Sequence, residues 1–298
     1  MHLRLQIRRF IMDNNESKAP EVSSGMSNLV LGKNTTYDNE YAPSRLQRIE
    51  RQLGRSHIER LQKFVGYDIW RLYEMTYLNL NGLPKVCMGI MRVPADSKYI
   101  VESKSLKLYE LSFTMTKFKD LKEVESVFEH DLSTLLESNV KVSLFELDNE
   151  EFSTRAVKGT CLEELDCCKD LSFKGYEYSP SLLTFDKEEK TIKKTYYTNL
   201  FRSLCPVTSQ PDHAVIRIDY EGKKPDLKGL LSYLVTLRNH QGFHEQCVEL
   251  IYSDLMYYLK PSKLTVSAYF TRRGGIDINP VRSSAKLNSS ESVRTIRQ

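Results

Sequence analysis

The chain has 298 residues, of which 40% are hydrophobic and 28% are charged, an ordinary balance for a globular protein of one large or two smaller domains. The net charge of +4 comes from the ends: residues 1–12 hold three basic groups and no acid, and residues 281–298 hold four against one. The body therefore offers no basic face for nucleic acid, and no apolar run is long enough to span a membrane.

The N-terminal residues, from Met1 to Phe10, are basic and amphipathic but lack the apolar run and cleavage site of a secretory signal. We expect residues 1–27 to be a disordered extension, with an organelle-transit segment as the weaker alternative. The six cysteines are then expected to be reduced thiols of a cytoplasmic protein. No C-x-x-C pair occurs, and no histidine is close in sequence to Cys161, Cys167 or Cys168, so no metal site is predicted.

The first half of the chain reads as a helix, a hairpin, a second helix and a strand. Residues 45–63 alternate polar residues with Leu and Ile, which suggests a polar helix interrupted at Gly54. Residues 68–77 and 86–93 are typical strands around the turn pair Asn81-Gly82. Apolar residues at helical spacing predict a helix over 121–136, and residues 140–147 alternate as a strand.

The second half follows a similar order. Residues 215–220 alternate as a strand, Asp226 caps a predicted helix, a second helix spans roughly 243–259, and residues 264–270 form a final strand. Asp131-Leu132 and Asp254-Leu255 each lie in a predicted helix that precedes a strand, at an offset of about 123 residues. Hairpins followed by helices, twice, predict an α+β fold with helices on one face of each sheet.

Cys205 lies in a loop that runs from Ser203 to Asp212 and contains Pro206 and Pro211. A lone cysteine is most often a small buried hydrophobic residue. The alternative is a nucleophile, which needs a nearby proton acceptor, and Asp212 could serve if the loop folds back. The residues alone leave both interpretations open.

His244 and Glu245 open the last predicted helix, where exposed amides favour anionic groups. The plainer interpretation is that these charged side chains cap the helix. Position 248 is Val248, so the H-E-x-x-H pattern of a zinc protease is not present.

Two basic segments could bind phosphate. Lys104 and Lys107 flank small hydroxyl residues, although a solvated charged edge would look the same. Arg273 and Gly274 lie directly after the last predicted strand, where an ordinary turn is the alternative. No two glycines are spaced as G-x-G, so a nucleotide would be held without a Rossmann or Walker loop.

In this order, the segments resemble the long-form 7-cyano-7-deazaguanine reductases of the tunnelling-fold superfamily, from about Leu31 to Ser283. The resemblance is carried by Glu102-Ser103-Lys104-Ser105-x-Lys107, the Cys205 to Asp212 loop, Phe243-His244-Glu245-Gln246-Cys247, and Arg272-Arg273-Gly274-Gly275-x-Asp277-Ile278-Asn279-Pro280. It implies two tandem tunnelling-fold units, built from antiparallel sheets with helices packed on one face, in a homodimer. The expected divisions are an extension (1–27), a first unit (28–150), a connecting insert (151–195), a second unit (196–283) and a tail (284–298).

The resemblance further implies NADPH-dependent reduction of the nitrile of 7-cyano-7-deazaguanine to a primary amine, in queuosine biosynthesis for tRNA modification. Cys205 would form a thioimide with the nitrile, and Asp212 would donate a proton to its nitrogen. The substrate would be bound by Val101, Glu102, Ser103, His244 and Glu245. The cofactor NADPH would be bound by Ser103, Lys104, Arg273 and Gly274.

Three rival functions remain open on the sequence. A zinc-dependent cyclohydrolase of the same superfamily would need ligands, for which Cys205, His240, His244 and Cys247 are the candidates. A cysteine hydrolase acting on nitriles would use Cys205 and release a carboxylate. A non-catalytic purine- or pterin-binding module would hold a base without using the cysteine.

Overall fold

The computed structural model describes residues 37–188, 190–287 and 293–298. Within them, eight strands form one sheet in the order β5-β3-β2-β10-β9-β8-β7-β6, and β1 pairs with β4 separately. The strands are β1 (Arg48–Glu50), β2 (Val65–Leu78), β3 (Pro84–Pro94), β4 (Tyr99–Val101), β5 (Lys141–Phe145), β6 (Thr160–Cys161), β7 (Thr191–Leu204), β8 (Pro211–Lys223), β9 (Lys263–Phe270) and β10 (Ile276–Ser283). The helices are α2 (Arg51–Arg55), α3 (Ser103–Leu111), α4 (Leu121–Leu136), α5 (Leu227–Thr236) and α6 (His244–Leu259). Short 3-10 helices are η1 (Pro43–Arg45), η2 (Glu150–Phe152), η3 (Asp166–Cys168), η4 (Pro180–Leu182) and η5 (Leu237–Asn239).

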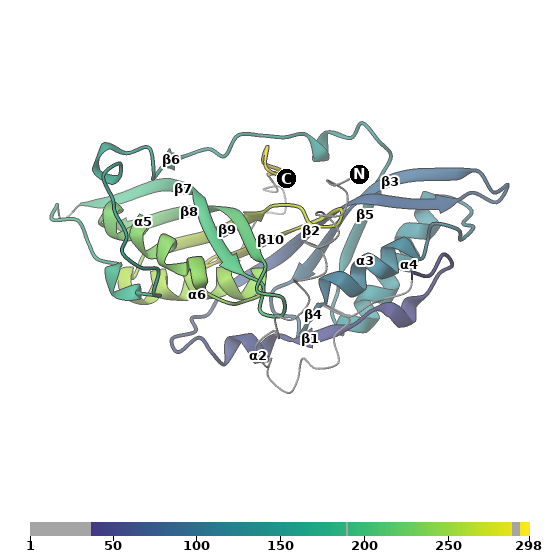
Figure 1. The fold of residues 1–298 in the computed structure, drawn as a ribbon, viewed down its shortest axis with the longest axis horizontal. Coiled ribbons are helices and arrows are strands. Elements are labelled where there is room, and N and C mark those ends of the chain that lie inside the picture. The colour runs from purple at the N-terminus through teal and green to yellow at the C-terminus, as the bar shows by residue number, and fades with distance from the viewer. Residues whose placement is uncertain (1–36, 189, 288–292) are drawn as a thin grey trace, which may run out of the picture.

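The helices α3, α4, α5 and α6 lie on one side of the sheet (Figure 1). Apolar side chains between sheet and helices form one core around Leu72 and Phe128 and a second around Ile216 and Leu255. Every pair of neighbouring strands in the large sheet is antiparallel except β6 with β7. The predicted α+β class, with helices on one face, is confirmed.

The internal repeat is visible in both the order of elements and the side chains. The series β2, β3, α3, α4, β5 matches β7, β8, α5, α6, β9. Asp131 on α4 accepts a hydrogen bond from the Tyr109 hydroxyl of α3 (2.6 Å), and Asp254 on α6 accepts one from the Tyr233 hydroxyl of α5 (2.6 Å). The strand β10 then pairs with both β9 and β2, so the two repeats share one continuous sheet.

The helix predicted over residues 45–63 is wrong. Only Arg51–Arg55 is α-helical, Gly54 lies inside that helix, and the residues before it pair with β4. The polar side chains that suggested an exposed helix are partly buried: Arg51 is 3% exposed. Tertiary contacts made by these arginines override the local pattern.

The long strands β7 and β10 were not predicted from the sequence, and neither were the short strands β1, β4 and β6. β7 begins inside the expected connecting insert, and β10 contains Asn279 and Pro280, which are uncommon in strands. β10 pairs with β2 along its whole length but with β9 only over residues 281–283, so Pro280 lies outside that second ladder. A proline is tolerated there because no β9 hydrogen bond is lost.

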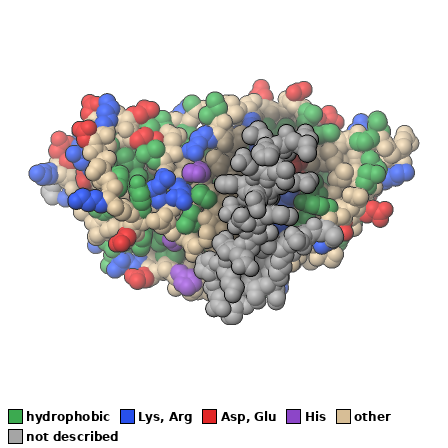
Figure 2. All heavy atoms as spheres, viewed as in Figure 1, with side chains coloured by type: hydrophobic (Ala, Val, Ile, Leu, Met, Phe, Trp, Pro, Cys, Tyr) green, Lys and Arg blue, Asp and Glu red, His purple; other side chains and the backbone are tan. Residues whose placement is uncertain are grey.

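The first part of the segment between β5 and β7, as far as β6, crosses the face of the sheet opposite the helices (Figure 1). The rest reaches the helix side, where the Tyr178 hydroxyl donates to Asp254 of α6 (2.7 Å). Residues 293–298, which were expected to belong to a tail, pack on the face opposite the helices: the Arg155 amide donates to the Arg294 carbonyl (2.8 Å), and the Gln298 side chain donates to Asn279 Oδ1 (2.6 Å). The extension expected over residues 1–27 lies outside the described residues. No helix of the described part is long and apolar enough to cross a membrane. Acidic and basic side chains are interspersed at both ends of the face seen in Figure 2.

Candidate active site

One cavity of about 270 Å³ lies where the two repeats meet, beside the ends of β2, β4, β7, β9 and β10. It is lined by Trp70, Ile100, Val101, Ser103, Lys104, Lys107, Cys205, Pro206, Gln210, Asp212, Gly242, Phe243, His244, Glu245, Thr271, Arg273, Gly274, Ile276 and Ile278. These residues come from all four motifs picked out in the sequence. Every predicted site residue except Glu102 lines this cavity.

Cys205 follows directly after β7 and is held by a short hydrogen-bonded loop. Its amide donates to the Gln210 carbonyl (2.9 Å), and the Ser209 amide donates back to the Cys205 carbonyl (2.9 Å). The neighbouring Leu204 pairs with the segment before α6, donating to His240 (2.9 Å) and accepting from Gly242 (3.1 Å). This pairing places the Cys205 loop beside the start of α6.

The other cysteines differ from Cys205 in their surroundings. All six cysteines fall within the described residues, and Cys205 alone among them lines the cavity. Burial raises the pKa of the Cys87 thiol to about 12 and that of Cys247 also to about 12, so both remain protonated near neutral pH. The position in the cavity is what separates Cys205 from a buried structural cysteine.

Asp212, at the start of β8, lies between two positively charged or polar partners. Its Oδ1 atom is 2.9 Å from Arg273 Nη2 and 3.4 Å from His244 Nε2. Arg273 Nη2 also donates to the Pro211 carbonyl (2.8 Å), which fixes the guanidinium against the β8 backbone. The carboxyl is 5% exposed, so it is available to the cavity but not to bulk solvent.

The turn between β9 and β10 aims Arg273 at Asp212. Arg273 and Ile276 exchange both backbone hydrogen bonds (2.9 and 3.0 Å) across Gly274 and Gly275, whose φ angles are 53° and 78°. Two consecutive positive φ angles define the tight hairpin turn that glycine makes at least cost. The ordinary-turn interpretation is thus correct for the backbone, while the arginine side chain reaches the cavity.

The plainer interpretation was that His244 and Glu245 cap α6, and they do not. The cap is provided by Gln246, whose side chain accepts from the Phe243 amide (3.0 Å). The His244 ring stacks on the Phe270 ring with centroids 3.8 Å apart, and its Nδ1 atom is buried without a hydrogen-bond partner among the described residues. Both side chains instead face the cavity.

Glu245 is 3% exposed, and its Oε1 atom has no hydrogen-bond partner among the described residues. Burial, with a contribution from the Asp68 carboxylate, raises its pKa to about 7, against the opposing charges of Arg51 and His244. A buried acceptor without a partner is costly unless a ligand supplies a donor. Glu245 is therefore suited to bind a ligand that carries N–H groups.

Glu102 differs from its predicted place in the substrate pocket. It is the N-cap of α3, where its carboxylate accepts from the backbone amides of Lys104 (2.9 Å) and Ser105 (2.7 Å). The carboxylate does not line the cavity, because the helix amides draw it toward the backbone. A solvated charged edge was the alternative for this segment. Ser103 is exposed and Lys104 is half-buried, but Ser105 and Glu102 are buried at the start of a helix, so only part of the segment faces solvent.

The sequence did not single out several cavity residues. Trp70 on β2 and Ile276 and Ile278 on β10 form an apolar wall of the cavity. The alternation of Ile276 and Ile278 could have indicated this wall if β10 had been recognised as a strand. Arg272, next to Arg273, points elsewhere: its guanidinium lies 3.7 Å from the centre of the Tyr73 ring.

Among the described residues, no group of three or more His, Cys, Asp or Glu side chains is arranged to hold a metal ion.

Residues 37–144 match the family model described as nitrile reductase, 7-cyano-7-deazaguanine-reductase N-term, and residues 211–289 match the model described as QueF-like protein. Cys205 lies just before the second match. Among solved structures, the chain matches the crystal structure of the archaeosine synthase QueF-Like in the apo form, at 13% identity over 34% of this chain and 100% of that chain, with a TM-score of 0.29. The two family matches together cover more than half of the chain, which belongs to the 7-cyano-7-deazaguanine reductase family of nitrile reductases, enzymes of queuosine biosynthesis.

Proposed function

We propose that this chain reduces the nitrile of 7-cyano-7-deazaguanine to a primary amine with NADPH, through a covalent intermediate at Cys205. The observation that carries the proposal is the composition of one cavity. A candidate nucleophile (Cys205), a carboxyl group (Asp212) and a buried carboxyl group whose Oε1 atom has no partner among the described residues (Glu245) all line it.

Cys205 supplies the first bond. A nitrile carbon accepts hydride poorly, and addition of sulfur turns it into a more reactive thioimide. In this step the carbon–sulfur bond forms, one carbon–nitrogen π bond breaks, and the thiol proton is replaced by a proton on the nitrile nitrogen. The step neither releases nor consumes a proton overall. It needs only one group that carries the proton from the sulfur to the nitrogen.

Asp212 is the group proposed to transfer that proton. Its Oδ1 atom is held by Arg273 (2.9 Å) and faces His244 (3.4 Å), which fixes the carboxyl in the cavity wall. His244, stacked on Phe270, would lie beside the reacting group. Holding the proton-transferring group in a fixed orientation can provide much of the rate acceleration of an enzyme.

Glu245 is the proposed anchor for the base. The guanine-like edge of the substrate presents a ring N–H and an exocyclic amine, and a carboxylate accepts from both at once. Val101 and Ser103 complete this side of the pocket. Glu102 supports them indirectly, because it fixes the first turn of α3.

The residues around the cavity fit NADPH, two molecules of which would in turn supply the two hydrides that the four-electron reduction of a nitrile to a primary amine requires. Phosphate groups need cations and close backbone approach, and Lys104, Arg273 and Gly274 in the cavity lining provide these. No atom of the described residues would contact a side chain added at Gly274 within 4 Å, so there is room at this position. Ser103 adds a hydroxyl next to Lys104.

The direct test is to incubate purified protein with 7-cyano-7-deazaguanine and NADPH. We expect NADPH oxidation and a primary amine product, identified by mass spectrometry. Release of a carboxylate without NADPH use would indicate a nitrile hydrolase, and binding without turnover would indicate a binding module. Activity that depends on added zinc would support a cyclohydrolase. A homodimer in the cytoplasm is our expectation for the assembly, and light scattering measures its mass.

A further inference from the structure

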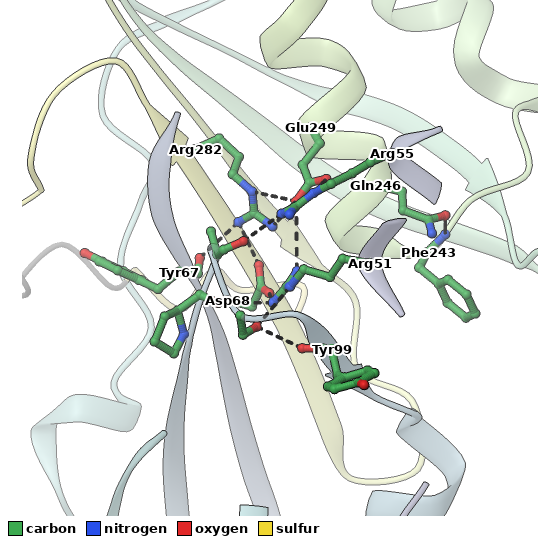
Figure 3. Close-up of polar contacts among 12 residues, drawn as sticks. Arg51, Arg55, Tyr67, Asp68, Tyr99, Phe243, Gln246, Glu249 and Arg282 are labelled. Atoms are coloured by element: carbon green, nitrogen blue, oxygen red, sulfur yellow. Dashed lines mark hydrogen bonds and ion pairs between the residues drawn. The ribbon is translucent and has the colours of Figure 1, made fainter. Parts of the chain in front are cut away.

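A cluster of five charged side chains joins the two repeats next to the cavity (Figure 3). Asp68 on β2 accepts from Arg51 Nη2 (2.6 Å) and Arg282 Nη1 (2.8 Å). Glu249 on α6 accepts from Arg55 Nη2 (2.8 Å) and Arg282 Nη2 (2.8 Å). Four of these side chains are 3% exposed or less, and Arg55 is 16% exposed.

The charges in this cluster do not balance. Three guanidinium groups face two carboxylates, which leaves one positive charge in excess away from water. Arg51 Nη1 has no hydrogen-bond partner among the described residues and lies 3.9 Å from Glu249 Oε1. A buried charge without compensation is strongly unfavourable, so the cluster is suited to a further anion nearby.

Glu245 can be that anion. It precedes Glu249 by four residues on α6, so the two carboxylates lie on the same helix face, one turn apart. The main charges that act on Glu245 come from three elements: Arg51 from α2, Asp68 from β2 and His244 from α6 itself. Arg51 and His244 favour the charged form, and burial and Asp68 oppose it.

We propose that Arg51 is a positioning residue for substrate binding, which keeps Glu245 in its carboxylate form and turned into the cavity to accept the N–H groups of the deazaguanine edge. The inference rests on the proposed function of Glu245 as base anchor. A protonated Glu245 would present its own donor to the donors of the substrate, so its charge state decides whether the edge is recognised.

The proposal predicts the direction in which substrate affinity changes with pH. Because the pKa of Glu245 is raised to about 7, substrate affinity should rise with pH through that range as the carboxyl loses its proton. Loss of the Arg51 charge should move the midpoint of this rise to higher pH. Loss of the opposing Asp68 charge should move it to lower pH, and opposite shifts cannot come from a general loss of structure.

The experiment is calorimetric titration of 7-cyano-7-deazaguanine into the Cys205→Ala protein, which cannot form the adduct, between about pH 5.5 and pH 9. In this background we expect Arg51→Met to raise the midpoint by roughly one unit, which is about tenfold weaker binding at low pH and little change at high pH. Arg51→Lys keeps the charge and should restore the original midpoint. Arg55→Met is the matched control: it removes a guanidinium of the same cluster that is not among the main charges acting on Glu245, so it should move the midpoint less than Arg51→Met does.

Two outcomes separate this inference from the proposed function. If Glu245→Gln keeps full affinity with an unchanged pH profile, Glu245 is not the base anchor and both proposals are overturned. If Glu245→Gln flattens the profile but Arg51→Met leaves the midpoint in place or weakens binding equally at every pH, this inference alone is overturned. Should Arg51→Met fail to fold, Asp68→Asn decides, since an unchanged or higher midpoint in that variant contradicts the proposal.

Discussion

Arg273 Nη2 lies 2.9 Å from Asp212 Oδ1, so the arginine proposed to bind the cofactor forms an ion pair with the proposed proton donor. The two residues come from different motifs, Asp212 at the start of β8 and Arg273 in the turn between β9 and β10. The glycine turn that follows Arg273 sets this contact, and the Pro211 carbonyl supports it (2.8 Å). Proton transfer and cofactor binding are therefore expected to depend on the same guanidinium group.

Arg273→Ala and Lys104→Ala should separate these two effects. Both variants lose a cation that lines the cavity and is proposed to bind the cofactor, so both should raise the apparent KM for NADPH more than that for the nitrile. Arg273→Ala should also slow adduct formation at Cys205 by about tenfold, because Asp212 loses the partner that orients it. Lys104→Ala should leave the adduct rate unchanged. Unaltered NADPH kinetics in both variants would contradict the cofactor assignment, and stopped-flow measurements give both quantities.

Asp212→Asn should keep substrate affinity and slow formation of the adduct by roughly 10²- to 10⁴-fold, the usual effect of a lost proton-transfer group. The shape of the side chain is retained, so the loss would come from its proton. Asp219→Asn is a matched control on the same strand, since Asp219 also pairs with an arginine, Arg217 (2.9 Å), but lies outside the cavity lining. A normal rate of adduct formation in the Asp212→Asn protein would mean that another group transfers the proton, with His244 the nearest candidate.

Glu110 should make stability depend on pH. Its side chain is buried, its Oε2 atom lies 3.7 Å from Lys107 Nζ, and burial raises its pKa to about 7 against the opposing charge of Lys107. The folded state therefore holds the proton more tightly than the unfolded chain, whose carboxyl titrates near the ordinary value of 4.5. This contribution to stability is fully present below that value and is lost as pH rises through about 7, by on the order of 2–3 kcal/mol.

Glu110→Gln has no proton to lose, so its stability should fall less than that of the original protein between about pH 5 and pH 8. Urea unfolding at several pH values measures the difference. Glu245 titrates in the same range but is present in both proteins, so the comparison isolates Glu110. Parallel pH profiles for the two proteins would show that Glu110 is not protonated in the fold.

The parts of the fold that could be predicted are those with strong local patterns. The β2–β3 hairpin and the helices α4 and α6 follow from alternation, a turn pair and helical spacing. The helix α3 and the strand β10 could not be read in this way. The α3 segment has few apolar residues at helical spacing, and β10 contains Asn279-Pro280, which is tolerated only because of how that strand pairs.

The candidate site was predictable as a set of motifs but not as an arrangement. The order of motifs picked out Cys205, Asp212 and Glu245, which the fold brings to one cavity. Local sequence could not reveal that Glu102 caps a helix instead of facing that cavity. Nor could it reveal the buried arginine cluster, because arginines such as Arg51 look like part of a solvated helix until their partners in distant elements are known.

Covalent capture of the nitrile by Cys205 is the central claim, and intact-protein mass spectrometry tests it most directly. Protein incubated with 7-cyano-7-deazaguanine and no NADPH should gain the mass of one nitrile molecule, and peptide mapping should place it on Cys205. Cys247→Ala, which removes a buried cysteine outside the cavity lining, should gain the same mass, and Cys205→Ala should gain none. An unmodified Cys205, together with a Cys205→Ala protein that still oxidises NADPH in the presence of the nitrile, would contradict the account.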